Sequence, residues 1–249
     1  MRVLITGGAA GLPAGIAVAL ARDGYDVSFT YRPGGTPPDR TRRLIEETGR
    51  AAGAFPVDFL AAEDALIAAL QTAVALPVQA LIHGVGPMAV RRFERATTKD
   101  YHEMIDGNFR SAVFAAEAVL PSMRDSRYGR IVFFALNSSH NAGGIRGLAL
   151  HAAAKAALVA FARSLALEEA HRGITVNVIE PGDLRDKTAD RSEALRRTAA
   201  NPRGRPGTWE DVADAARFFL DPSHDFVNGA VLAVTGGLIE PYERSAPNS

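Results

Sequence analysis

Short β-branched runs alternate along this chain with longer segments whose apolar residues recur at helical spacing. Alternation of these two periods indicates strands joined by helices, which is the pattern of a parallel sheet covered on both faces. Strands are predicted at residues 3–5, 26–31, 51–57, 80–83, 130–134, 174–179 and 230–234. Helices are predicted at residues 14–23, 41–48, 62–75, 99–120, 151–172 and 209–220. The sequence therefore predicts a doubly wound α/β fold with a seven-stranded parallel sheet.

The rest of the chain gives no sign of a second core. Segments rich in proline and glycine at 32–38 and 201–207 are short enough to be loops, and no solenoid-length repeat is present. We expect a single domain over residues 1–249. Lysine and arginine number 28 against 28 acidic residues, which disfavours a nonspecific binder of nucleic acid or anionic membrane. The absence of cysteine excludes disulfides, thiolate metal sites and a cysteine nucleophile. The N-terminal sequence lacks signal-peptide features, so we expect a cytoplasmic protein.

A glycine-rich turn follows the first strand directly. It reads Thr6-Gly7-Gly8-Ala9-Ala10-Gly11-Leu12 and leads into an alanine-rich helix. Glycines at that place let the backbone approach a pyrophosphate, whose charge the helix N-terminus favours. We therefore predict a Rossmann-type dinucleotide site here, with a purely structural turn as the alternative. Pro13 removes one backbone amide and adds bulk at this turn.

The residues after the second strand bear on the choice of nucleotide. No acidic residue is present there to accept hydrogen bonds from an adenosine ribose, and Arg32 stands in its place. A guanidinium pairs bidentately with phosphate, so NADP is expected over NAD. The alternative is an arginine that is merely exposed on a loop.

These motifs resemble the short-chain dehydrogenase/reductase family, and the C-terminal part is similar to its 3-oxoacyl-[acyl-carrier-protein] reductases. The likeness extends from residue 1 to about 238 and includes Thr6, Gly7 and Gly11 of the turn. It implies hydride transfer between NADP(H) and a ketone or secondary alcohol. It also implies a homodimer or homotetramer.

The resemblance places four catalytic positions on this chain. Asn108 and Lys155 match the family's asparagine and lysine, and Ser138 lies thirteen residues before position 151, with Ser139 as the alternative. Position 151, where the family has a tyrosine, is histidine. Imidazole can exchange protons, so His151 is a candidate acid or base. A nearby lysine disfavours imidazolium and favours the role of base. Alternatively, His151 is a residue retained after the family's chemistry was lost.

Further cofactor contacts follow from the same resemblance. Asp58 matches an aspartate that contacts the adenine amino group, although it could instead cap the next turn. His83 and Gly84 stand where relatives usually have two asparagines, and Pro181 and Gly182 match the loop that flanks the nicotinamide. Residues from about 184 to 205, Thr188 included, are expected to form a lid over the substrate, the alternative being an ordinary solvated helix.

Other chemistries have weaker support. His83, His140 and His151 follow strands or line the predicted crevice, but they show no metal-ligand spacing, so no metal is expected. A serine hydrolase is disfavoured because the Gly-x-Ser-x-Gly turn is absent. Two alternatives to the oxidoreductase stay open. One is a noncatalytic NADP-binding or scaffolding relative, and the other is a nonredox reaction with His151 as base.

Overall fold

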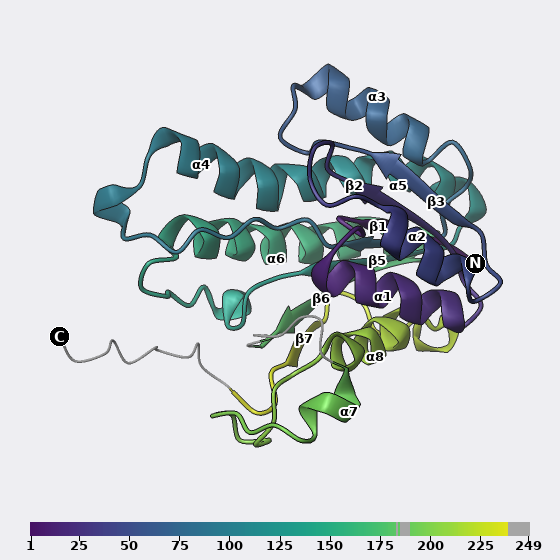
Figure 1. Cartoon of the computed structure of the whole chain (residues 1–249). Helices are drawn as coiled ribbons and strands as arrows, with labels where there is room; N and C mark the ends of the chain where they lie inside the picture. Colours follow the sequence, from purple (N-terminus) through teal and green to yellow (C-terminus); the bar gives the residue numbers. More distant parts are fainter. Residues whose placement is uncertain (183, 185–189, 239–249) are drawn as a thin grey trace.

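The computed structural model describes residues 1–182, 184 and 190–238, and its strands form one parallel sheet (Figure 1). Their order is β3-β2-β1-β4-β5-β6-β7. The strands are β1 Arg2–Thr6, β2 Asp26–Tyr31, β3 Ala52–Pro56, β4 Ala80–His83, β5 Gly129–Phe134, β6 Ile174–Pro181 and β7 Val231–Val234. The predicted doubly wound fold with seven parallel strands is thus confirmed.

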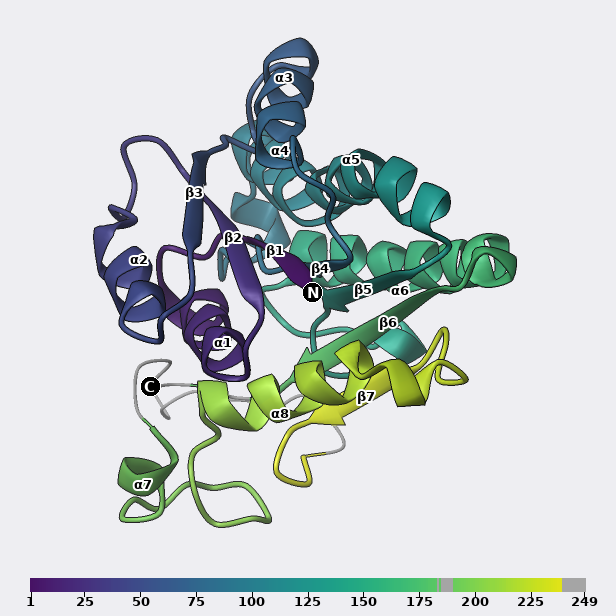
Figure 2. The ribbon, with the colours of Figure 1, turned by 90° about the vertical axis from the view of Figure 1, so that its right-hand side faces the viewer.

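Helices cover both faces of the sheet (Figure 2). One face carries α1 Gly11–Arg22, α2 Asp39–Glu46 and α8 Trp209–Leu220, and the other carries α3 Glu63–Ala73, α5 Ser111–Ser126 and α6 Ala149–Glu169. Because side chains alternate along a strand, Leu4 packs into one core and Ile5 into the other. Burial on both faces explains why the strands are almost continuously apolar.

The single helix predicted over residues 99–120 is wrong in detail. The structure has α4 Thr98–Ile105, a π-helical turn at Asp106–Arg110 and then α5, which continues to Ser126. Helical spacing of apolar residues does not register a local change of pitch, so the π turn escaped prediction. Pro121 lies inside α5. The helix runs past this proline, and Met123, two residues further on, is fully buried in the core.

The remaining short elements lie in connections. They are the 3₁₀ turns Phe93–Arg95, Ser139–Asn141, Ala170–Arg172 and Pro222–His224, together with α7 Arg191–Ala194. Within the described part of the chain, the stretch 149–172 alone is long and apolar enough to cross a membrane, and α6 packs against β6 instead.

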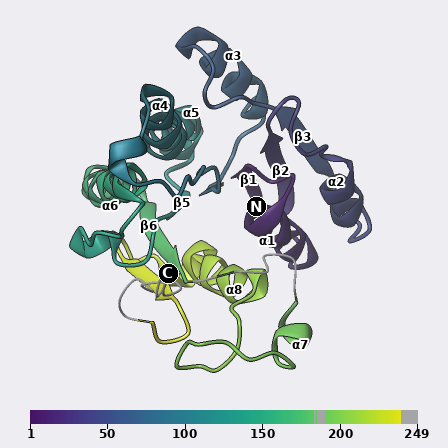
Figure 3. The same cartoon turned by 60° about the vertical axis from the view of Figure 1, so that its left-hand side comes forward.

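The sheet reverses its strand order between β1 and β4, which lie side by side at its centre. Their last residues, Thr6 and His83, are directly paired. In open sheets of this kind, ligands bind beyond the carboxyl ends of strands at such a reversal. Figure 3 shows the helices arranged on the two sides of this central region.

Candidate active site

The glycine turn has the backbone shape that phosphate binding requires. Gly7 and Gly11 adopt left-handed conformations with φ of +71° and +60°. The amide of Gly7 donates to Thr30 Oγ1 at 3.1 Å, which ties the turn to β2. No side chain caps the start of α1, so its first amides stay available to an anion, while Leu12 packs into the core.

Pro13 is accommodated because the residue opposite it, Gly84 after β4, has no side chain. A Cβ on Gly84 would lie 2.4 Å from Cγ of Pro13 and 2.8 Å from the carbonyl oxygen of Thr6. The proline ring therefore fills space that any larger residue at position 84 would need. Gly84 and Pro13 form a complementary pair, and the turn keeps its conformation despite the proline.

His83 lies inside the protein at the strand reversal. Its Nδ1 is 2.9 Å from Thr6 Oγ1 and its Nε2 is 3.0 Å from Ser111 Oγ. Thr6 Oγ1 accepts from the amide of Gly84, so its own hydrogen is donated to Nδ1, and Nε2 carries the ring proton. Ser111 in turn donates to the carbonyl of Gly107 in the π turn. Burial, with a smaller effect of Lys155, lowers the pKa of His83 to about 3, so the ring is neutral.

This chain of hydrogen bonds links the glycine turn to the turn that carries Asn108. His83 is 1% exposed and both of its ring nitrogens are engaged. We therefore assign His83 to support of the site. Direct contact of its ring with a cofactor stays a prediction that this placement disfavours.

Asn108 and Lys155 meet at Gly86. A Cβ on Gly86 would lie 3.1 Å from Asn108 Oδ1 and 3.1 Å from Lys155 Nζ. Asn108 Nδ2 donates to the carbonyls of Met104 and Pro87, but its buried Oδ1 has no hydrogen-bond partner among the described residues. Lys155 Nζ donates to Phe134 O at 2.7 Å, and burial lowers its pKa to about 8. The two predicted residues thus present an unused acceptor and a cation to the same small space.

His151 lies on the first turn of α6 and is 5% exposed. Its Nδ1 donates to the carbonyl of Pro87 at 3.1 Å, so in the neutral ring Nε2 holds a lone pair. Burial and the charge of Lys155 lower its pKa to about 4, although the bond to Pro87 opposes this. At neutral pH His151 can accept a proton but has none to give from Nε2.

The two candidate serines differ in what their hydroxyls do. Ser139 Oγ accepts a hydrogen bond from the amide of Leu136 and so closes the turn after β5. Ser138 adopts a left-handed conformation with φ of +70°, which costs a non-glycine residue about 1 kcal/mol. Ser138 stays the first candidate to face a substrate, with Ser139 as the alternative. Strain of this kind is common at functional sites.

A buried carboxylate beside these serines escaped the sequence analysis. Glu180, at the end of β6, is completely buried and accepts the amides of Ser138 and His140 at 3.1 and 3.0 Å. It also contacts His140 Nδ1 at 2.8 Å. An acidic residue directly after the strand predicted at 174–179 was the available signal, because a charge is rarely buried without a partner.

The two residues proposed for the adenosine half lie at strand ends. Arg32 directly follows β2 and is exposed, and the described residues give it no ion-pair partner. Asp58 Oδ1 accepts the amide of Leu60 at 3.0 Å, as the alternative of a turn cap predicted. One carboxylate oxygen of Asp58 is engaged in that bond, and its contact with adenine stays a prediction.

On the opposite side of the crevice, Pro181 ends β6 and Gly182 packs tightly on β7. The amide of Gly182 donates to Val234 O, and a Cβ there would lie 2.8 Å from the Cα of Thr235. A pocket of about 290 Å³ lies between this strand end and residues of the predicted lid, among them Leu184, Asn201 and Arg205. Thr188 lies outside the described residues.

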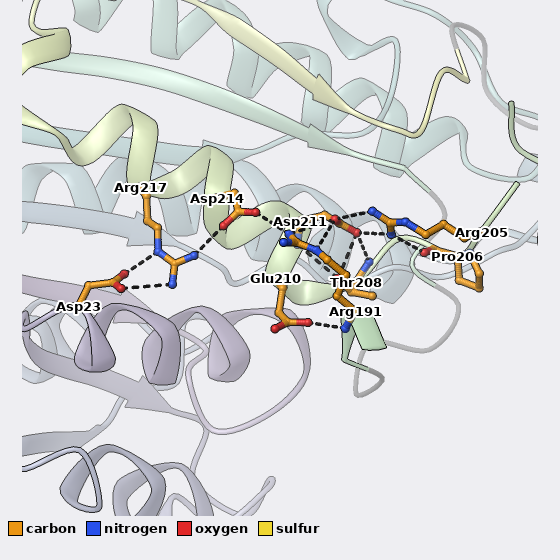
Figure 4. Close-up of polar contacts among 9 residues, drawn as sticks. All are labelled: Asp23, Arg191, Arg205, Pro206, Thr208, Glu210, Asp211, Asp214 and Arg217. Atoms are coloured by element: carbon orange, nitrogen blue, oxygen red, sulfur yellow. Dashed lines mark hydrogen bonds and ion pairs between the residues drawn. The ribbon is translucent and has the colours of Figure 1, made fainter. Parts of the chain in front are cut away.

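The described part of the predicted lid is attached to α8 by ion pairs (Figure 4). Arg191 contacts Asp211 and Asp214, and Arg205 donates to both carboxylate oxygens of Asp211 at 2.7 and 2.8 Å. Arg217 donates to Asp214 and also to Asp23, the residue that directly follows α1. Among its described residues, 184 and 190–205, the segment holds the short helix α7 Arg191–Ala194. Among the described residues, no cluster of His, Asp or Glu is placed to hold a metal.

Comparison with known proteins gives matches over nearly the whole chain. The family model described as enoyl-(acyl carrier protein) reductase matches residues 7–239. The 3-oxoacyl-[acyl-carrier-protein] reductase MabA of Mycobacterium tuberculosis is 31% identical over 242 residues, covering 95% of this chain and 92% of MabA. The hydroxynaphthalene reductase-like protein Arp2 of Metarhizium majus is 30% identical over 255 residues, covering 95% and 94%. The structure of acetoin dehydrogenase from Enterobacter cloacae superposes with a TM-score of 0.85 at 22% identity, covering 99% and 98%, which shows a shared fold.

Proposed function

This chain belongs to the short-chain dehydrogenase/reductase family, and on that premise we propose that it is an NADP(H)-dependent oxidoreductase that interconverts a ketone and a secondary alcohol. Compounds of the 3-oxoacyl type are the first candidate substrates, because MabA is named as a reductase of that class. We further propose one nucleotide-binding domain over residues 1–249, cytoplasmic and acting as a homodimer or homotetramer. The observation that carries the proposal is the meeting of Asn108 Oδ1 and Lys155 Nζ at Gly86.

The residues present fit a nicotinamide nucleotide. The uncapped start of α1 offers amides to a pyrophosphate, and the unpartnered Oδ1 of Asn108 marks a buried polar atom that needs a donor. Pro13 does not spoil the turn, because Gly84 makes room for it. The residues proposed to hold the nucleotide are Thr6, Gly7, Gly11, Leu12, Arg32, Asp58, Gly84, Lys155, Pro181 and Gly182, with His83 behind them.

The chemistry divides among four side chains. When bound, the nicotinamide supplies or accepts the hydride. The hydroxyl of Ser138 donates a hydrogen bond to the substrate oxygen, and Lys155 and Asn108 orient the ribose and an ordered water. His151, neutral with its lone pair on Nε2, acts as an acceptor within the site. The proton that a reduction adds to the oxygen must come from another group.

Titration with NADPH and NADH, followed by nicotinamide fluorescence or calorimetry, tests the proposal. Micromolar binding of NADPH, followed by turnover in a carbonyl screen, would support it. His151→Phe should then lower kcat at least tenfold while leaving NADPH affinity within about twofold, because the imidazole hydrogen-bonds only to the carbonyl of Pro87 among the described residues. No binding of either nucleotide would refute the proposal.

The replacement of the family tyrosine favours one alternative. A neutral imidazole suits removal of a proton without redox chemistry, such as isomerisation or dehydration. Turnover of a carbonyl compound with no change in nicotinamide absorbance would identify that reaction. Tight NADPH binding with no turnover of any compound would instead identify a noncatalytic relative.

A further inference from the structure

A second imidazole, His140, lies at the same strand ends and is held differently from His151. It belongs to the 3₁₀ turn Ser139–Asn141, which follows β5 and packs against α6, the helix of His151 and Lys155. Its side chain is 34% exposed, whereas Glu180, its partner on β6, is completely buried. One end of the imidazole is thus anchored inside the protein, and the ring as a whole reaches solvent.

The contact with Glu180 fixes the orientation of the ring. Nδ1 lies 2.8 Å from Glu180 Oε2, so the Nδ1 proton points at the carboxylate. The backbone amide of His140 donates to Oε1 of the same carboxylate at 3.0 Å. No hydrogen bond joins Nε2 to another described residue. Among the described residues, Nε2 is therefore the ring nitrogen that is open to a substrate.

The same carboxylate also holds the residue proposed to bind the substrate oxygen. The amide of Ser138 donates to Glu180 Oε2 at 3.1 Å, the oxygen that contacts His140 Nδ1. Further hydrogen bonds hold the strained left-handed backbone of Ser138, because its carbonyl oxygen accepts from the amides of Asn141 and Gly143. Glu180 therefore sets the positions of a hydroxyl and an imidazole two residues apart.

We propose that His140, oriented by Glu180, exchanges the proton with the substrate oxygen in place of the missing tyrosine. The proposal rests on the oxidoreductase function proposed above. In reduction, the carbonyl carbon gains the hydride of the reduced nicotinamide, and the carbonyl oxygen gains the Nε2 proton of imidazolium. The C=O bond becomes CH–OH, the nicotinamide is oxidised, and His140 is left as a neutral imidazole that keeps its Nδ1 proton, hydrogen-bonded to Glu180. Solvent then reprotonates the exposed ring.

Paired variants test the transfer. His140→Asn keeps an N–H that can donate to Glu180 but has no transferable proton, so kcat should fall at least 100-fold. NADPH affinity should stay within about twofold, and Tm within a few degrees. His102→Asn is the matched control, because His102 also contacts a carboxylate, Asp106 at 3.3 Å, on the exposed surface of α4. It should leave kcat unchanged.

A chemical readout is independent of turnover. Diethyl pyrocarbonate carbethoxylates accessible imidazoles, so peptide mass spectrometry of the full chain should find His140 and His102 modified faster than buried His83 and His151. NADP⁺ together with the best alcohol found in the screen should protect His140 and not His102. External imidazole should restore part of the activity of His140→Ala.

The possible outcomes distinguish failure of the His140 assignment from failure of the proposed oxidoreductase function. If the wild-type protein turned over no substrate with either nucleotide, both proposals would fall. If it turned over substrate and His140→Asn kept a rate within twofold, the His140 assignment alone would fall. Loss of NADPH affinity along with rate, without rescue by imidazole, would show that His140 only stabilises the turn and would also overturn the inference.

Discussion

The contact between Gly15 and Trp209 predicts a substitution whose effect depends on the partner residue. Gly15 lies in α1, and a Cβ there would stand 2.6 Å from Cγ and 2.7 Å from Cδ2 of Trp209 on α8. Alanine is favoured over glycine inside a helix by about 0.8–1.0 kcal/mol. Overpacking costs about 1–3 kcal/mol. Gly15→Ala should therefore destabilise the protein by up to about 2 kcal/mol, which lowers Tm by about 2–4 °C per kcal/mol.

The sign of the effect should change when the ring is removed. The three atoms nearest to the added Cβ all belong to Trp209, and in a Trp209→Ala background only the Cβ of residue 209 remains of them. It stands at 2.9 Å in the present structure, and a shift of a few tenths of an ångström relieves the contact. The helix preference for alanine then dominates, and Gly15→Ala should be neutral or stabilise by up to about 1 kcal/mol.

Urea unfolding followed by circular dichroism measures all four proteins of this cycle. Trp209 is the single tryptophan of the chain, so its fluorescence also reports displacement of the ring in Gly15→Ala. Gly144→Ala is the control, because a Cβ there meets nothing within 4 Å and φ is not left-handed. Equal free-energy changes for Gly15→Ala in both backgrounds would refute the packing argument.

Three further predictions concern charge. His83 and His151 have pKa values lowered to about 3 and about 4, so the unfolded chain binds more protons below pH 6.5, and stability should fall with pH. Each histidine should lower the free energy of unfolding by about 2 kcal/mol at pH 5 relative to neutral pH. Urea unfolding at both pH values should show a smaller loss for His83→Asn and for His151→Phe than for the wild-type protein. Arg32→Ala should weaken NADPH about 10–100-fold and leave NADH affinity nearly unchanged, since a hydrogen bond to a charged group contributes about 1.5–3 kcal/mol. Calorimetry showing equal losses would assign Arg32 a structural role. Although burial raises it, bonds from Arg205 and Thr208 lower the pKa of Asp211 to about 2. Asp211→Asn should therefore cost on the order of 2 kcal/mol at pH 7, a difference that shrinks as pH falls from about 4 toward 2.

The fold followed from local pattern because each strand has to be apolar on both faces. β2 and β4 begin and end at the predicted residues. The prediction of helix boundaries failed at Asp106–Arg110, where the apolar spacing continues through a π-helical turn. This turn brings Asn108 Nδ2 to two carbonyl oxygens. Spacing of apolar residues contains no information on pitch within one turn.

The candidate site was predictable to the extent that topology alone places it. Residues that follow β4 and β5 share one sheet edge, so the meeting of Lys155 with the loop of Gly86 is a consequence of strand order. Contacts between residues far apart along the chain could not be predicted from the sequence. Pro13 and Gly84 are separated by 71 residues along the chain, and His140 and Glu180 by 40, and a single sequence gives no sign that either pair touches.

The departures from the family pattern are coupled, and this coupling bears on whether the site still works. Pro13 would clash with any side chain at position 84, and position 84 is glycine. His83 replaces an asparagine and finds an acceptor in Ser111. A site released from selection accumulates changes that leave buried groups unpaired, because nothing preserves their partners. Compensation at both of these departures therefore favours a working site, in which His140 and its buried partner Glu180 are the proposed proton donor pair. If His140→Asn and Glu180→Gln both left turnover intact, the protein would still be an enzyme, but its proton chemistry would not depend on this pair.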